Sequence, residues 1–264
     1  MYDFTYHRPS SLDEAASLLA GAEDGQFIAG GQTLLPTLKQ RLARVTDVID
    51  LGGIGELSGI AVLGSRIEVG ATTRHADVAA SADVRNAIPA LAELADSIGD
   101  RQVRNQGTIG GSLANNDPAA DYPAAVLGLN ATVHTNSREI AADDFFTGMF
   151  ETALDAGEII TKVSFPLPEK AGYAKFPNPA SRYAIVGVMV AATGSGVRVA
   201  VTGAGSCVFR ARDIEGALAA DFSASALDGV TVSADKLNSD LHASAEYRAH
   251  LVKVMAKRAV AAAG

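Results

Sequence analysis

Two pairs of adjacent glycines, each reached through a short apolar stretch, constrain this sequence more than any other feature. Gly30 and Gly31 lie in "FIAGGQTLLPTL", and Gly110 and Gly111 lie in "NQGTIGGSLANNDPAADYP". For a single pair, two readings stay open: a tight turn with positive φ, or a bare backbone whose N–H groups can hold phosphate oxygens. The sequence does not tell what approaches these glycines so closely.

The repetition of the pattern favours phosphate binding. Each pair is followed by a hydroxyl-bearing residue and then by apolar residues, and Thr33, Thr108 and Ser112 are candidate donors. Two separate segments suit a ligand with two phosphates, such as the pyrophosphate of a dinucleotide. The common dinucleotide signature is absent, because no Gly-x-Gly-x-x-Gly opens a helix after the first predicted strand. The nearest spacing, within residues 52–59, leads into a predicted hairpin and indicates a turn.

The composition is that of a globular chain. Its 264 residues suffice for one large domain or two modest ones. The net charge of −8, without a basic stripe, disfavours binding to nucleic acid or to anionic membranes. No apolar signal segment opens the chain, and no run approaches the roughly 20 apolar residues of a membrane helix. We therefore expect neither export nor membrane insertion.

Cysteine and histidine usage limits the metal chemistry of this chain. Cys207 is the only cysteine, so no intrachain disulfide can form, which is typical of a reducing cytoplasm. An iron–sulfur cluster usually needs about four cysteine ligands, so this chain cannot hold one alone. The five histidines are scattered without zinc-site spacing, and we expect no metal site.

The sequence of the first half of the chain predicts two different arrangements of strands and helices. A helix capped by Ser11, a strand ending at the first glycines, a helix over residues 33–43 and a second strand form a small parallel β–α–β unit. From residue 60 a β-hairpin with Gly64 at its turn follows, and then two helices. The second glycine pair lies in a predicted long loop.

The second half predicts more strands in residues 124–140 and 157–168. Prolines and a glycine within residues 166–172 indicate a boundary. Two paired strands follow, then a short helix over residues 212–220 and a long amphipathic helix capped by Ser244.

Several stretches together carry a resemblance to a known family. They are "AGGQTLLPTLKQR" with "VIDL", "IEVGATTRHADVAAS", "IPALAELADSIGDRQVRNQGTIGGSLANNDPAADYPAAVLGL" and "KFPNPASRYAIVGVMVAA". In this order the chain resembles the FAD-binding subunits of molybdenum hydroxylases, above all the medium subunit of carbon monoxide dehydrogenase-like enzymes. The flavin domain of xanthine dehydrogenase is a more distant relative.

The resemblance implies an α+β fold. Residues 1–170 would form a PCMH-type, vanillyl-alcohol-oxidase-like FAD-binding domain of two α+β lobes, at about 1–55 and 56–170. Residues 171–264 would form a small C-terminal domain with a three-stranded antiparallel sheet and helices.

The resemblance also implies which residues bind the cofactor. The two glycine segments would supply phosphate-binding loops: Ala29, Gly30, Gly31, Gln32, Thr33, Leu34, Thr108, Ile109, Gly110, Gly111 and Ser112. Asp121 would contact ribityl or ribose hydroxyls, and Ile160 would meet the flavin or adenine through its backbone. Lys175 and Tyr183 would approach the isoalloxazine ring. No residue of this chain is expected to be catalytic toward an organic substrate.

Some of these positions keep alternatives. Asp121 could cap a turn, and Tyr183 could be a core strand residue, since aromatic residues favour strands. His75 fits a helix start better than a catalytic role. Gln32 stands where the family often has His, Ser or Asn, which leaves any contact by that side chain open.

The implied function is electron transfer by noncovalently bound FAD. Substrate would be oxidised at a molybdopterin centre on a large partner subunit, and electrons would pass through [2Fe–2S] clusters on a small subunit to FAD and an external acceptor. The expected assembly is a dimer of heterotrimers in the cytoplasm, at the inner face of the membrane through its partners. A self-sufficient flavin reductase or oxidase and a non-redox nucleotide-binding protein are the alternatives. The substrate stays open: carbon monoxide, a purine, an aldehyde or an N-heteroaromatic compound.

Overall fold

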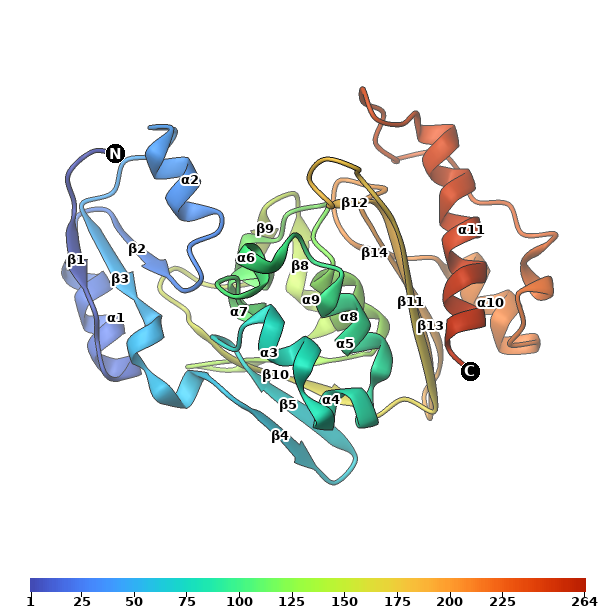
Figure 1. Cartoon of the computed structure of the whole chain (residues 1–264), viewed down its shortest axis with the longest axis horizontal. Coiled ribbons are helices and arrows are strands. Elements are labelled where there is room, and N and C mark those ends of the chain that lie inside the picture. Colours follow the sequence, from blue (N-terminus) through green and yellow to red (C-terminus); the bar gives the residue numbers. More distant parts are fainter.

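The computed structural model describes residues 1–264, and the chain runs through three consecutive regions. In Figure 1 an N-terminal lobe (blue) lies on the left, a central lobe (cyan to yellow-green) in the middle, and a C-terminal region (yellow to red) on the right. The expected α+β architecture of two lobes followed by a C-terminal antiparallel sheet is confirmed.

The N-terminal lobe is built on a parallel sheet in the order β1-β3-β2. Its strands are β1 (Thr5–His7), β2 (Gly25–Ile28) and β3 (Asp47–Asp50), and its helices are α1 (Leu12–Gly21) and α2 (Leu34–Lys39). Two 3₁₀ turns follow, η1 (Leu51–Gly53) and η2 (Gly55–Leu57). Ser11 caps α1 by accepting the Glu14 N–H at 3.2 Å. The predicted β–α–β unit is therefore confirmed.

The central lobe contains an antiparallel sheet in the order β4-β5-β10-β6-β7. Its strands are β4 (Ile60–Leu63), β5 (Arg66–Gly70), β6 (Thr132–Thr135), β7 (Glu139–Ala141) and β10 (Ile160–Pro166), beside a small hairpin of β8 (Phe146–Gly148) and β9 (Glu151–Thr152). Its helices are α3 (His75–Ala80), α4 (Ala82–Ala87), α5 (Pro89–Asp96), α6 (Arg101–Arg104), α7 (Ile109–Asn115), α8 (Tyr122–Gly128) and α9 (Ala142–Phe145). The predicted hairpin is confirmed, with Gly64 at φ +61° in its turn.

Two parts of the central lobe differ from the sequence-based expectation. The predicted long loop contains helices α6 and α7, each with its own cap: Asp100 accepts the Val103 N–H at 2.8 Å, and Thr108 accepts the Gly111 N–H at 3.2 Å. Residues 124–140 contain strands as predicted, namely β6 and the start of β7, but the stretch begins within helix α8, all of whose residues are buried. A fully buried helix carries the same continuous apolar pattern as a buried strand.

The C-terminal region has one strand more than expected. The sheet β11-β12-β13-β14 is antiparallel and consists of β11 (Lys170–Pro177), β12 (Ala184–Thr193), β13 (Gly196–Thr202) and the two-residue β14 (Phe209–Arg210). Helices α10 (Arg212–Ala220) and α11 (Ala245–Ala262) and the 3₁₀ turn η3 (Ser225–Leu227) complete it. Ser244 caps α11 as predicted, accepting the Tyr247 N–H at 3.2 Å.

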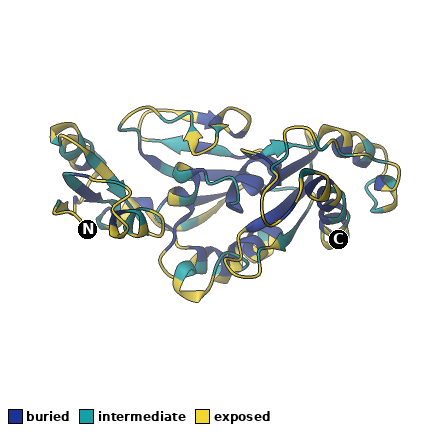
Figure 2. Cartoon of the chain, turned by 90° about the horizontal axis from the view of Figure 1, so that it is seen from above, coloured by how far each residue is buried: buried dark blue, intermediate teal, exposed yellow.

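The core runs continuously from the central lobe into the C-terminal sheet. One cluster of buried residues joins β5, β6 and β10 to helices α5 and α8 and to Met189 and Ala200 of the C-terminal sheet. Figure 2 shows the buried residues, in dark blue, gathered in the middle of the molecule, with exposed residues around them. Arg198 adds a polar connection, because its guanidinium donates to the Leu127 carbonyl at 2.9 Å and to Asp143 at 2.6 Å. None of the helices combines the length and hydrophobicity that crossing a bilayer requires.

Candidate functional site

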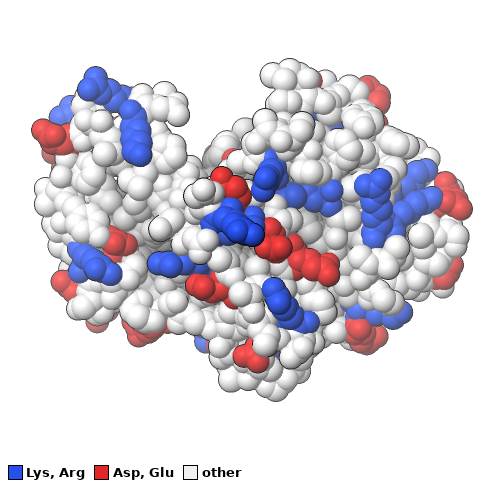
Figure 3. Space-filling view, viewed as in Figure 1, with Lys and Arg blue, Asp and Glu red and all other residues white.

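A cavity of about 640 Å³ lies between the N-terminal lobe and the central lobe. Figure 3 shows the molecular surface hollowed between the N-terminal lobe on the left and the rest of the molecule. The volume lies within the usual range for ligand sites, about 300–1,000 Å³. Of the residues predicted to hold a cofactor, all but Ile109 and Lys175 line this cavity: Ala29, Gly30, Gly31, Gln32, Thr33, Leu34, Thr108, Gly110, Gly111, Ser112, Asp121, Ile160 and Tyr183.

The first glycine segment joins strand β2 to helix α2 with its N–H groups unpaired. None of the backbone N–H groups from Ala29 to Thr33 donates to a backbone carbonyl. Gly31 has φ +66°, a conformation that residues with a side chain rarely adopt. Successive unpaired N–H groups around a left-handed residue form a concave site for anions. This segment can therefore hold phosphate oxygens.

Gly30 lacks a side chain for a different reason than Gly31. A Cβ at Gly30 would overlap the Gln106 carbonyl oxygen and would lie 2.7 Å from the Gly107 Cα atom. The group that passes so close to the first glycine pair is thus the backbone just before the second pair. The two segments are about 75 residues apart in sequence, and their backbones are in contact where both line the cavity.

The second glycine segment is the first turn of helix α7, and its N–H groups are already used. Ile109 and Gly110 donate to the Thr73 and Ala71 carbonyls at 3.1 and 2.8 Å, and Gly111 donates to Thr108 Oγ1. Neither glycine has a positive φ. A Cβ at Gly110 would lie 2.6 Å from Ala71 Cβ, so this glycine permits close packing. The second segment is therefore not an open loop, because Ala71, Thr73 and Thr108 accept its N–H groups.

Ile109 and Ser112 lie in this turn in different surroundings. Ile109 is fully buried and belongs to the main core, where it anchors α7. Ser112 is half-buried and lines the cavity together with Thr108 and Gly111. The second segment thus presents side-chain hydroxyls and the edge of a helix turn to the cavity.

Asp121 is the buried acidic group of the site. Its carboxylate accepts the Tyr173 hydroxyl at 2.5 Å and pairs with Lys175 Nζ at 3.0 Å, and its side chain is only 4% exposed. Burial raises the pKa of Asp121, although Lys175 and Tyr173 lower it in part. Asp121 precedes α8 but makes no capping bond, so it is an ion-pair partner rather than a turn cap.

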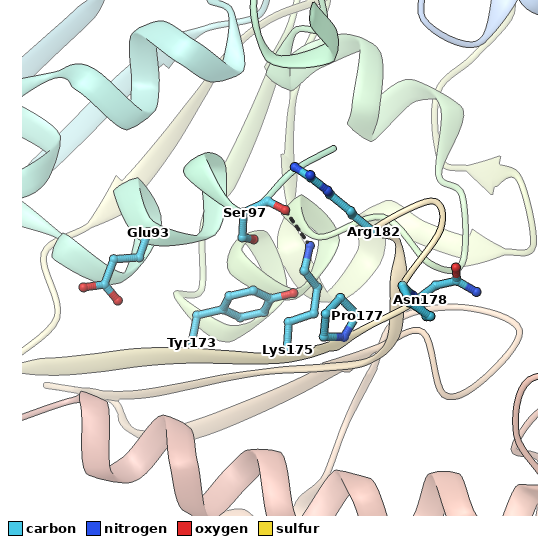
Figure 4. A pocket seen from close by; sticks show the side chains of 8 residues that line it. Glu93, Ser97, Tyr173, Lys175, Pro177, Asn178 and Arg182 are labelled. Carbon is cyan, nitrogen blue, oxygen red and sulfur yellow. Dashed lines mark hydrogen bonds between the residues drawn. The ribbon is translucent and has the colours of Figure 1, made fainter. Parts of the chain in front are cut away.

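Lys175 stands on the far side of Asp121, in an adjoining pocket of about 460 Å³. Figure 4 shows that its amine reaches the Ser97 carbonyl, a contact of 2.9 Å, and that Tyr173 lies beside it on β11. Arg182 lines both the pocket and the cavity, and its guanidinium donates to the Gly99 carbonyl at 3.1 Å. Lys175 can therefore act on the cavity only through Asp121 or past Arg182.

Tyr183 and Ile160 close the remaining sides of the cavity. Tyr183 is 47% exposed and precedes β12, so it is not a core strand residue. Partial burial and then Asp117 and Asp121 raise the pKa of its hydroxyl, which stays protonated at neutral pH. Ile160 begins strand β10 and is 5% exposed.

The cavity has further residues that the sequence did not single out as ligands, including His75, Gly107, Glu158 and Arg182. His75 begins helix α3, as expected, and burial followed by the charge of Arg104 lowers its pKa to about 4. Glu158 is held by Arg138 at 2.9 Å, which with further hydrogen bonds lowers the pKa of its carboxyl. No local sequence pattern predicts that these residues line a ligand site, because only tertiary contacts bring them to the cavity. No group of three or more His, Cys, Asp or Glu side chains is arranged to hold a metal ion.

Comparison with known proteins accounts for nearly the whole chain. The family described as the FAD binding domain in molybdopterin dehydrogenase matches residues 2–168, and the CO dehydrogenase flavoprotein C-terminal domain matches residues 171–263. The chain is 37% identical to the nicotine 6-hydroxylase medium subunit of Paenarthrobacter nicotinovorans (98% of this chain, 96% of the relative). It is 33% identical to the glyceraldehyde dehydrogenase medium chain of Sulfolobus acidocaldarius (97% of each). The structure of reconstituted CO dehydrogenase from Oligotropha carboxidovorans superimposes with a TM-score of 0.91 at 32% identity, covering 99% of this chain and 98% of the other.

Proposed function

Since this chain belongs to the family of FAD-binding medium subunits of molybdenum hydroxylases, we propose that it holds FAD noncovalently in the cavity between its lobes and relays electrons. The observation that carries the proposal is the row of unpaired N–H groups from Ala29 to Thr33, next to a cavity of ligand size. The chain divides, in this proposal, near residue 170 into an FAD-binding domain and a C-terminal domain.

The pyrophosphate lies on the first glycine segment. The N–H groups of Gly30 to Thr33 donate to its oxygens, and the left-handed Gly31 keeps them convergent. The second segment contributes the hydroxyls of Ser112 and Thr108 and the edge of α7, while Ala71 and Thr73 retain the N–H groups of Gly110 and Ile109. The first glycine segment thus binds the phosphates, and the second segment forms one side of the cavity.

The flavin end lies toward Asp121 and Tyr183. Asp121 accepts a sugar or ribityl hydroxyl with the part of its carboxylate that faces the cavity, while Tyr173 and Lys175 hold it from behind. Tyr183 covers the ring with its exposed face, and Ile160 supplies an apolar wall with its backbone nearby. Lys175 acts on the ring through its ion pair with Asp121.

FAD supplies the redox chemistry here, and the chain supplies placement and polarity. Electrons reach the FAD from [2Fe–2S] clusters on a small partner subunit and leave to an external acceptor. The relatives act, by their names, on nicotine, glyceraldehyde and carbon monoxide. Substrates that differ so much while the medium subunit keeps its fold indicate that a large molybdopterin subunit selects the substrate. The assembly we propose is a dimer of heterotrimers in the cytoplasm.

The deciding experiment measures flavin and turnover separately. The purified chain should bind one FAD per chain, and denaturation followed by filtration should release all of it. Assay of the same chain with and without its co-expressed partner subunits should give substrate turnover only in their presence. Flavin that stays attached after denaturation contradicts noncovalent binding, and turnover by the single chain favours a self-sufficient flavoenzyme. If a folded chain reconstituted with FAD holds none, the result favours the alternative of a non-redox nucleotide-binding protein.

A further inference from the structure

His75 is a buried side chain that the proposed function does not use. It begins helix α3, is 5% exposed and lines the cavity. Its ring lies 5.3 Å from the ring of Tyr122, measured between centroids. His75 Nδ1 and the Tyr122 hydroxyl are both buried without a hydrogen-bond partner in the protein. Because a buried polar atom without a partner is costly, an imidazole at this place needs a reason.

The imidazole is in direct contact with Gly107. A Cβ at Gly107 would lie 2.5 Å from His75 Nε2 and 2.9 Å from its Cδ2 atom. The backbones are also joined, since the His75 N–H donates to the Gly107 carbonyl at 2.9 Å. Gly107 is glycine because the imidazole fills the space where a side chain would stand.

Gly107 is in turn in contact with the first glycine segment. A Cβ at Gly30 would lie 2.7 Å from the Gly107 Cα atom. The imidazole therefore contacts the Gly107 backbone, which in turn contacts the Gly30 backbone. We call this series of contacts, from His75 through Gly107 to Gly30, the stack. The stack begins in the central lobe and ends in the N-terminal lobe, at the residues with unpaired N–H groups.

We propose that His75 is a positioning residue for FAD, which sets the place of the Ala29–Thr33 segment by acting through Gly107. The inference rests on the proposed function, because it assumes that this segment binds the pyrophosphate. His75 acts by its volume and planarity, since its Nδ1 atom makes no bond within the protein.

The electrostatic surroundings keep the imidazole uncharged. Charged residues on the helices packed against α3 are Asp83 and Arg85 on α4, Glu93 and Asp96 on α5, and Arg101 and Arg104 on α6. Burial comes first and the charge of Arg104 second in lowering the pKa of His75 to about 4, so the ring is neutral at pH 7. A neutral ring can pack under Gly107 without attracting a counter-ion into the cavity.

The first test removes the imidazole of His75. For His75→Ala we expect the dissociation constant of FAD to rise at least about tenfold, which corresponds to about 1.4 kcal/mol. The ³¹P resonances of the bound pyrophosphate should shift, which a general loss of stability would not cause. His75→Gln, whose side chain is long enough to reach Gly107, should restore most of the affinity. The exposed His250→Gln on α11 is the control and should change neither quantity.

The second test uses compensation within the stack. Gly107→Ala places a methyl group against the imidazole and should weaken FAD binding. Combining it with His75→Ala should bind FAD more tightly than Gly107→Ala alone, because the methyl group then occupies the vacated space. Should His75→Ala not fold, His75→Val takes its place in both tests with the same expectations.

The outcomes separate the inference from the proposed function. Unchanged affinity and ³¹P resonances in a folded His75 variant overturn the inference, and so does a double variant no better than Gly107→Ala. Failure of the wild-type chain to bind FAD would instead overturn the proposed function.

Discussion

Gly31 and Gly110 both belong to adjacent glycine pairs at the same cavity, but they are glycines for opposite reasons. Gly31 has φ +66° and lies among unpaired N–H groups, whereas Gly110 lies in a helix turn with its N–H bonded to Ala71. Gly31 leaves the backbone open to a ligand, whereas Gly110 lets two protein segments approach closely, as Gly30 does beside Gln106 and Gly107. A glycine pair alone therefore does not identify a phosphate site. Its N–H groups can bind phosphate only where no protein carbonyl or hydroxyl already accepts them.

The largest effect should come from Gly110→Val. Its side chain would stand against Ala71, whose Cβ and backbone oxygen lie 2.6 and 2.8 Å from the added Cβ. We expect the free energy of unfolding of the apoprotein to fall by about 3 kcal/mol, as for an overpacked core. Urea unfolding measures it, with Gly216→Val on α10 as control, since a Cβ there meets nothing within 4 Å. A stable apoprotein that has lost FAD would show that Gly110 serves the ligand after all.

Acid should destabilise the folded chain through His75. The pKa of His75 is about 4 in the folded chain and about 6.5 when unfolded, so the unfolded chain binds the proton first. The free energy of unfolding is at its full value well above pH 6.5 and decreases as the pH falls toward 4, by about 2.5 kcal/mol at pH 4.5. Urea unfolding of the apoprotein at pH 7 and 4.5 should show this loss in the wild type and a loss smaller by that amount in His75→Gln. Equal losses in the two proteins would contradict the buried, neutral imidazole.

Gly31→Ala should separate ligand binding from folding in the first segment. A side chain at φ +66° costs about 1–2 kcal/mol and disturbs the convergent N–H groups. We expect FAD affinity to decrease at least about tenfold, while the apoprotein loses about 1 kcal/mol of stability. The control is Gly64→Ala at φ +61° in the β4–β5 turn, which carries the same backbone strain outside the cavity. A Cβ at Gly64 meets nothing within 4 Å, whereas a Cβ at Gly31 would also lie 2.9 Å from Leu35 Cδ1, so the control isolates the backbone part of the cost. If both variants retain wild-type affinity, the open segment does not bind the pyrophosphate.

The smallest effect should come from the hydroxyl of the second segment. Ser112→Ala removes one donor that lines the cavity, and we expect the dissociation constant of FAD to rise about two- to fivefold, within the usual net value of one hydrogen bond. Equilibrium titration of apoprotein with FAD measures it, with Ser195→Ala in the β12–β13 turn as control. A loss of a hundredfold would make the second segment an equal partner in phosphate binding.

Local sequence patterns were sufficient for elements whose environment is local. The caps at Ser11 and Ser244, the hairpin at Gly64 and the parallel unit around the first glycines follow from nearby residues, and all are confirmed. Helix α8 was not separable from a strand, because burial on all sides removes the periodicity that distinguishes the two.

The arrangement of the site depended on contacts between distant segments. That Gly30 rests on Gly107, that Ala71 occupies the N–H of Gly110, and that Asp121 pairs with Lys175 are facts of tertiary packing. The resemblance to a family supplied the fold and the residues to inspect, but it did not distinguish the open segment from the closed one.

The ion pair of Asp121 and Lys175 crosses the boundary between the two family domains, and this limits how medium subunits can be recombined. Asp121 lies before that boundary, at residues 168–171, whereas Lys175 and Tyr173 lie after it. A chimera that takes its C-terminal region from a relative without these two side chains would bury a carboxylate with no partner, at a cost of about 3–5 kcal/mol. Exchange of C-terminal regions between medium subunits should thus succeed only where Asp121, Tyr173 and Lys175 travel together.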